Sequence, residues 1–169
     1  YMKNELIIIL FLLNMSVLHA QDQKCKVTSQ VIYTKMDLFV GFSFIYEKSK
    51  MDHELSFNTG INRTFFQNKL FPMFQYTYSY KCLDKKQLIF GPSVSLNFSL
   101  LNIKTNQNNF HFYPELLTGY KILYGKRIGI IHKASIGILF EGFQNYKSET
   151  NWVNTLSYHI NIGIYYAIK

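Results

Sequence analysis

The last stretch of the chain, residues 152–169, reads WVNTLSYHINIGIYYAIK and separates into two alternating sets of side chains. The even-numbered positions from Leu156 to Ile168 are all apolar, whereas most of the odd-numbered ones from Thr155 to Ala167 are small or polar. A period of two is that of a β-strand. Strands of globular proteins usually have about five or six residues, and a tilted strand that crosses a membrane needs about 9–11. The stretch therefore predicts a long strand with its apolar face toward lipid and its other face toward the inside of a narrow barrel.

The same alternation recurs along the rest of the sequence and predicts eight strands. Pro92 falls on the outward face of one of them, and a proline cannot donate to a sheet ladder, so we expect a bulge or weakened pairing there. The expected strands are Val27–Thr34, Leu38–Tyr46, Leu55–Asn62, Phe74–Lys81, Leu88–Leu100, Phe112–Ile122, Ile128–Glu141 and Trp152–Lys169.

The connections between these strands differ in length at the two ends of the expected barrel. An even strand number puts both termini at one end, together with the short connections Lys48–Asp52, Asp84–Lys86 and Tyr124–Lys126. The connections at the other end, around Gln67–Lys69, Thr105–Asn109 and Gly142–Asn151, are mostly longer, and Lys35–Asp37 is a short exception. Short periplasmic turns and longer external loops are typical of outer-membrane barrels. The sequence thus predicts an all-β fold, an eight-stranded antiparallel up-and-down transmembrane β-barrel.

The first 20 residues have the organisation of a secretory signal peptide. Lys3 supplies a positive charge, Leu6–Leu13 is apolar, and Ala20 offers a small residue for cleavage. The apolar run is too short for a membrane anchor, because a spanning helix needs about 20 residues. We therefore divide the chain into a signal peptide, residues 1–20, and a barrel domain, residues 21–169.

Composition narrows the class of protein further. Aromatic residues make up 17% of the chain and the net charge is +8. The positive charge is explained either by solvated turns and loops or by attraction to anionic lipid head groups and lipopolysaccharide phosphates. No nucleic-acid motif is present. A secreted, soluble lipid-binding barrel is the main alternative, but it would carry its charges on the outside of its strands, whereas here Lys and Asp concentrate in the turns.

Aromatic residues gather near the strand ends, as expected for side chains that anchor a barrel at the membrane interfaces. We expect one belt at the outer connections and one at the inner connections. The outer belt would comprise Phe65, Phe66, Phe71, Phe110, Phe143 and Trp152, and the inner belt Tyr46, Tyr80, Tyr120, Tyr124 and Tyr166.

The end of the chain resembles the C-terminal assembly signal of outer-membrane barrels, a polar-x-Gly-x-x-aromatic-x-hydrophobic pattern. Here Asn161, Gly163, Tyr166 and Ile168 match it, with Lys169 after the final apolar position. Because this signal occurs together with the strand pattern over residues 27–168, the chain resembles small eight-stranded outer-membrane barrels of the OmpA/OmpX type. The resemblance implies a monomeric integral protein of the outer membrane, recognised by the barrel-assembly machinery and in contact with outer-membrane lipids. It implies a structural or surface-interaction role.

Inward charges are expected on the sixth and seventh strands, at Glu115, Lys121, Lys133 and Glu141. Buried charges persist when they are paired, so these residues predict a salt-bridge network, with Glu115 and Lys133 as diagonal neighbours. The interior of an eight-stranded barrel is just wide enough to be filled by side chains. We therefore expect a filled lumen and no wide pore.

The sequence offers candidates for a catalytic site and for a disulfide, but none for a metal site. Pairing across the turns places Glu115, Ser135 and His159 side by side, but a catalytic triad needs the His in the middle. We therefore expect no enzyme, with a lipid-modifying enzyme of the outer membrane as the alternative. The histidines show no metal-ligand spacing, His132 has an outward position that suggests a bulge or register shift, and no cofactor is expected. The sequence leaves open a disulfide between Cys25 and Cys82, in a compartment that permits one.

Overall fold

Alternating residues form nine antiparallel strands in the computed structural model, which describes residues 24–63, 71–85, 87–104, 108–144 and 150–168. No helix in these ranges is long and apolar enough to cross a membrane. The strands are β1 (Lys24–Thr34), β2 (Leu38–Lys48), β3 (Met51–Gly60), β4 (Pro72–Tyr80), β5 (Leu83–Lys85), β6 (Leu88–Lys104), β7 (Asn108–Gly125), β8 (Ile128–Gln144) and β9 (Thr150–Ile168).

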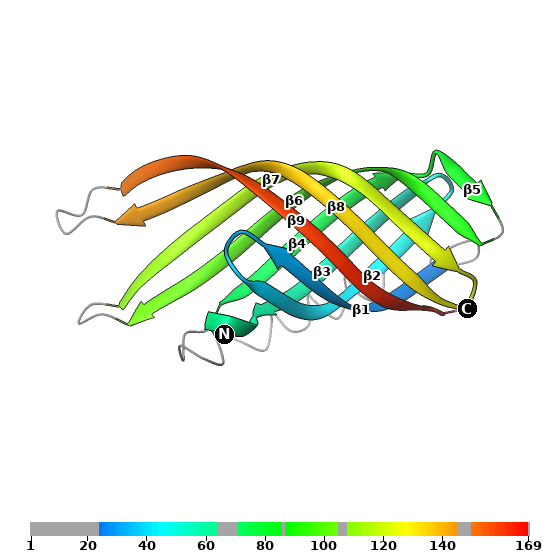
Figure 1. Ribbon diagram of the computed structural model, residues 1–169, viewed down its shortest axis with the longest axis horizontal. Coiled ribbons are helices and arrows are strands. Elements are labelled where there is room, and N and C mark those ends of the chain that lie inside the picture. Colours follow the sequence, from blue (N-terminus) through cyan, green and yellow to red (C-terminus); the bar gives the residue numbers. More distant parts are fainter. Residues whose placement is uncertain (1–23, 64–70, 86, 105–107, 145–149, 169) are drawn as a thin grey trace, which may run out of the picture.

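Eight of these strands close into a barrel (Figure 1). Consecutive strands pair with each other from β1 to β4 and from β6 to β9. The barrel is closed by the pairing of β9 with β1 and of β4 with β6. The β1–β9 seam runs without interruption from Cys25↔Ile168 to Thr34↔His159. Closure leaves no row of unpaired backbone groups along the wall, which is the condition for a sheet in hydrocarbon. The predicted eight-stranded antiparallel barrel is confirmed.

The two faces of the wall follow the predicted alternation. On β9, Leu156 and Ile164 are 64% and 63% exposed on the outside, whereas Ser157 and His159 are 1% and 2% exposed on the inside. The same parity holds for His132, which lies outside beside the Tyr120 ring at 5.7 Å. The ladders on both sides of His132 run in constant register, so the bulge that we suggested there is absent. A soluble lipid carrier would need the opposite distribution, with apolar side chains inside.

The barrel has two different ends. One end, called here the terminal end, holds the start of β1, the end of β9 and tight turns at residues 49–50 and 126–127. At the other, the distal end, the hairpins β6–β7 and β8–β9 project well past β1–β4, on the left of Figure 1. Both Trp152 and Val153 are exposed there, as expected where a hairpin has left the barrel wall. Much of the length that we assigned to distal loops is therefore strand.

Pro92 coincides with an interruption of the sheet. The β4–β6 ladder ends at Ser79↔Ser93, and the pairing resumes at Leu83↔Phe90 in β5. Three residues of one chain segment therefore face two of the other, which is a bulge. This bulge separates β5 from β4, and it explains why the predicted turn Asp84–Lys86 is partly a short strand.

Two apolar clusters lie inside the barrel near its ends, where the alternation had predicted mainly small and polar residues. Phe71, predicted to belong to the outer aromatic belt, is fully buried in the distal cluster, since it packs on Phe39 and Tyr113. Phe65 and Phe66 lie outside the described residues. The distal cluster comprises Ile32, Phe39, Phe71, Met73, Tyr113 and Leu139, and the terminal cluster Ile45, Leu123, Ile131 and Tyr165.

Candidate functional site: the charged barrel interior

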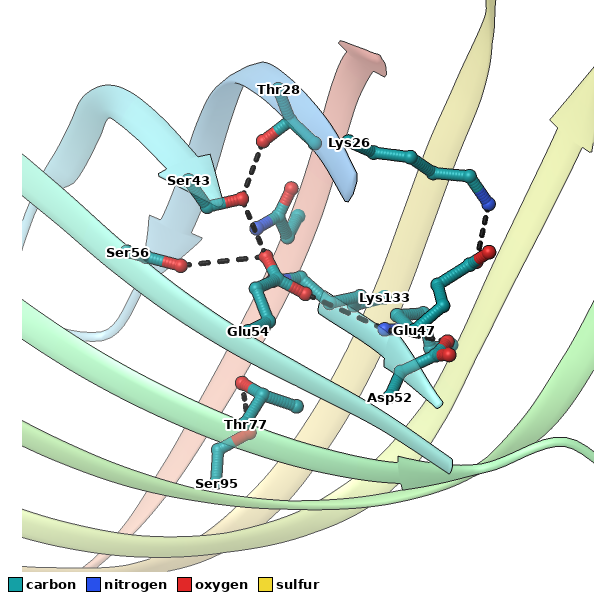
Figure 2. A network of polar contacts seen from close by, with 12 residues as sticks. Lys26, Thr28, Ser43, Glu47, Asp52, Glu54, Ser56, Thr77, Ser95 and Lys133 are labelled. Carbon is teal, nitrogen blue, oxygen red and sulfur yellow. Dashed lines mark hydrogen bonds and ion pairs between the residues drawn. The ribbon is translucent and has the colours of Figure 1, made fainter. Parts of the chain in front are cut away.

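Glu54 lies at the centre of the charged part of the lumen. It is fully buried, and its carboxylate is 2.6 Å from Lys133 Nζ and 3.7 Å from Lys121 Nζ. Ser43 also donates a hydrogen bond to it at 2.8 Å. Figure 2 shows this carboxylate pointing from β3 across the lumen toward the opposite wall.

The ion pairs continue from Glu54 toward the terminal end. Asp52 accepts contacts from Lys121 at 3.2 Å and from Lys81 at 3.0 Å. Lys81 is also 3.6 Å from Glu47, which pairs in turn with Lys26. Four lysines and three carboxylates thus alternate in one connected chain. We call it the lumen ion chain; its members are Lys26, Glu47, Lys81, Asp52, Lys121, Glu54 and Lys133.

The sheet register explains why the carboxylates are needed. Lys121 and Lys133 stand directly opposite each other on β7 and β8. Two like charges in that position repel each other. Asp52 and Glu54 alternate on the inward face of β3 and reach both lysines from the other side of the lumen. A buried charge is tolerated when a partner of opposite sign compensates for its lost hydration.

Neutral side chains form hydrogen bonds across the middle of the lumen. Asn161 on β9 donates to Gln30 at 2.7 Å, and Gln30 donates to Asn58 on β3 at 3.0 Å. These bonds link three strands through their side chains, in addition to the backbone ladder. The hydroxyl groups of Thr28 and Ser43, and those of Thr77 and Ser95, form hydrogen bonds between adjacent strands, with oxygen–oxygen distances of 2.5 and 2.9 Å.

A second cluster surrounds Glu115. Its carboxylate is 2.8 Å from His159 Nε2, and it accepts hydrogen bonds from Ser157 at 2.5 Å and Asn97 at 2.9 Å. The carboxylate stands between the Ser and the His, and both of these come from β9. A nucleophilic serine needs the imidazole as its direct partner. The arrangement is therefore one of buried polar packing.

The predicted pairing of Ser135 with His159 is confirmed, but that of Glu115 with Ser135 is wrong. Glu115 pairs in register with Leu139, and Ser135 pairs with Gly119. The error comes from the turn, because the first pair of this hairpin is Gly125↔Gly129, with Gly125 at a φ of 131°. As a result, each residue of β7 pairs with a residue of β8 that lies four positions later in the sequence than the predicted partner.

The four predicted inward charges therefore do not form one group. Lys121 and Lys133 belong to the lumen ion chain, whereas Glu115 pairs with His159. Lys133 and Glu115 are not partners. Glu141 is half-buried and interacts with Tyr113 near the distal end.

Sequence reasoning missed five members of the lumen ion chain, namely Lys26, Glu47, Asp52, Glu54 and Lys81. The signal was present, because Asp52 and Glu54 continue the inward series of Ser56 and Asn58. We had assigned Lys48–Asp52 to a turn, but the turn contains only Ser49 and Lys50, and Ser49 has a φ of 54°. The charges near this turn suggest solvated side chains, but in the structure the strand continues and Asp52 and Glu54 face inward.

The residues of the proposed assembly signal lie on the strand that closes the barrel. Asn161 and Gly163 face inward, and a Cβ at Gly163 would be 2.5 Å from the carbonyl oxygen of Ser29. Tyr166 and Ile168 face outward and are 42% and 47% exposed. The Tyr166 hydroxyl accepts a hydrogen bond from Arg127 at 2.6 Å.

Cys25 and Cys82 are both exposed and are not bridged. Cys25 is the second residue of β1 and Cys82 follows β4, so that β2 and β3 separate the two strands in the sheet. Among the residues that the structure describes, no group of His, Cys, Asp and Glu side chains could hold a metal ion.

No protein-family model and no curated protein sequence matches the chain. Its fold is similar to that of the N-terminal β-barrel domain of OprF from Pseudomonas aeruginosa, at 10% identity and a TM-score of 0.62 over 86% of this chain and 97% of that one. It is also similar to a major outer membrane protein of Thermus thermophilus, at 8% identity and a TM-score of 0.53 over 88% of this chain and 100% of that one. These likenesses support the fold of a small outer-membrane barrel.

Proposed function

We propose that the chain is an integral β-barrel of the outer membrane with a structural or surface-interaction role and a lumen closed to ions. The outer face supports the location. Large apolar side chains cover it on every one of the eight barrel strands, as on Phe44, Leu55, Leu96 and Ile136. Such a surface is unstable in water and suited to the hydrocarbon of a bilayer. Export through a cleaved signal peptide, residues 1–20, would bring it there.

The lumen ion chain is the main observation that supports a closed lumen. Each of its seven side chains is buried and lies within ion-pair distance of a partner of opposite sign. An ion that moved along the axis would have to separate buried pairs, which costs several kcal/mol for each uncompensated charge. The apolar clusters around Phe71 and Tyr165 also fill part of the lumen near its two ends.

A structural or interaction role follows from what the barrel offers to partners. The projecting hairpins β6–β7 and β8–β9 present strand ends beyond the wall, on the side that would face the exterior. The basic net charge suits lipopolysaccharide phosphates. We propose outer-membrane lipids and, during folding, the barrel-assembly machinery as its partners, and a monomer as its functional state. Catalysis is not proposed, because the Ser157–Glu115–His159 order does not activate a nucleophile.

Planar-bilayer recording of the purified monomer tests the closed lumen. We expect negligible conductance from the native protein. Replacing Lys121 and Lys133 together by Ser shortens two long side chains that stand opposite each other in the lumen, and we expect small additional current from that variant. Replacing the wall residues Ser93 and Ser95 by Ala is the matched control and should leave the conductance unchanged. Large, stable steps from the native monomer would contradict the proposal.

A further inference from the structure

A cavity of about 620 Å³ opens at the terminal end of the lumen. Its size is that of a site for a small molecule, since such sites measure roughly 300–1,000 Å³. The hollow exists because the inward positions on one wall are small: β7 ends in Gly125 and β9 carries Ala167. Ile89, which packs on the terminal cluster around Tyr165, also lines the cavity. The cavity is thus a recess at the mouth of the barrel that reaches the terminal cluster.

The lining of this recess is strongly basic. Among the described residues, it contains six cationic side chains and two carboxylates, those of Glu47 and Asp84. The cationic residues are Lys24, Lys26, Lys81, Lys85, Lys126 and Arg127. They come from the start of β1, the segment around β5 and the β7–β8 turn, so they surround the recess from several sides.

Only two of these six cations, Lys26 and Lys81, form an ion pair among the residues that the structure describes. Lys26 and Lys81 share Glu47, and Arg127 donates to the Tyr166 hydroxyl. Lys24, Lys85 and Lys126 form no ion pair with any residue that the structure describes. Positive charges that line a concave site concentrate the field and raise the local concentration of anions.

We propose that this recess binds a small soluble anion that carries several phosphate groups. Lysine ammonium groups bind phosphate as point charges, and three unpaired lysines around one recess match a ligand with charges on several sides. Most of the lining of the recess comes from inward positions and from turns at the terminal end, and only Ile168 belongs to the lipid-facing wall. The recess would therefore take its ligand from the aqueous compartment and not from a lipid head group. The proposal does not depend on whether the lumen conducts.

Calorimetric titration with tripolyphosphate tests the proposal, on the folded barrel in micelles of a zwitterionic detergent at low salt. We expect saturable binding of about one anion per barrel, weakened about tenfold or more by the double change Lys85→Gln and Lys126→Gln, because two unpaired charges are lost. Ala167→Phe fills the hollow without a change of charge and should also reduce binding. Heat-modifiability on gels verifies that each variant is folded.

Lys48→Gln with Lys50→Gln is the matched control, because both residues lie at the same end of the barrel but do not line the recess. This control should bind like the native protein. Equal loss in the control would mean that diffuse surface charge attracts the anion, and it would overturn the proposal. Absence of saturable binding would do the same. Complete displacement of tripolyphosphate by phosphatidylglycerol added to the micelles would assign the lysines to lipid head groups and would also overturn it.

Discussion

At the scale of single residues, Glu54 has the central position in the lumen. Its carboxylate oxygens lie 2.6 Å from Lys133 Nζ and 3.7 Å from Lys121 Nζ and so compensate both positive charges. These two lysines are directly opposite each other on β7 and β8. Removal of Glu54 would leave two buried cations side by side, with Lys121 retaining only Asp52. The lumen ion chain therefore depends on this carboxylate more than on any surface charge.

We predict that Glu54→Met lowers the free energy of unfolding by about 3–5 kcal/mol, the usual cost of breaking a buried pair by removing one partner. Urea-induced unfolding of the barrel in lipid vesicles, followed by gel mobility or fluorescence, measures this change.

The double variant Glu54→Met with Lys133→Met is the informative control. It removes both members of the closest pair and leaves Lys121 with Asp52. Replacement of a whole buried pair by apolar residues is often neutral or stabilising, so the double variant should be more stable than Glu54→Met alone. If the double variant is the less stable of the two, the pair is not coupled as the structure indicates.

Residue parity was predictable from the sequence, but residue partners were not. Alternation is local, and it correctly placed Lys121, Lys133, Glu115 and His159 inside. Partnership depends on the register of hairpins and on contacts across the lumen. The register of β7 and β8 is decided by the turn after Gly125, whose geometry the alternating pattern does not contain. Asp52 and Glu54 were missed because the strand continues further into the turn than its polar composition suggested.

At the scale of elements, β8 separates the two environments most clearly. Ile136 is 51% exposed on the outer face, and its neighbour Ser135 faces inward. We predict that Ile136→Arg lowers the stability of the barrel in lipid by about 2–4 kcal/mol, the cost of an arginine facing lipid near the bilayer midplane.

Ser135→Thr, on the inner face of the same strand, should have a much smaller effect. Both variants can be measured by urea unfolding in the same vesicles. Equal losses of stability would show that the face assigned to lipid is wrong.

The closing strand β9 supports a second prediction at this scale. Tyr166 and Ile168 are exposed at the end of β9, where an assembly factor can contact them, although Tyr166 also bonds to Arg127. Replacing both by Ser should lower the amount of heat-modifiable, protease-resistant barrel in the outer membrane of expressing cells.

The same double change at Val94 and Leu96, two outward positions of the middle strand β6, is the control. It should weaken folding in detergent but spare recognition in cells. Assembly of the Tyr166 and Ile168 variant at the native level would mean that this stretch is not an assembly signal and that Tyr166 is only one more residue of the interfacial aromatic belt.

At the scale of the whole molecule, closure of the sheet determines the location that we propose. The seams β1–β9 and β4–β6 leave the barrel wall without an open edge, and its outer face is apolar while its interior is polar and charged. Strand number and closure were predictable because alternation, turns and an even count all indicate the same barrel. The bulge at Pro92 was also predictable, because a proline cannot donate to the ladder. The projecting hairpins and the two internal apolar clusters were not, since they depend on how distant strands meet.

The distribution of the expressed chain between cell fractions tests this central claim most directly. Cells that express the full sequence are lysed, the membranes are washed at alkaline pH to remove peripheral proteins, and inner and outer membranes are separated by density. We predict that the protein stays in the outer-membrane fraction after the wash, as an integral barrel must. Recovery of the folded protein in the soluble fraction, or its release by the alkaline wash, would contradict the account.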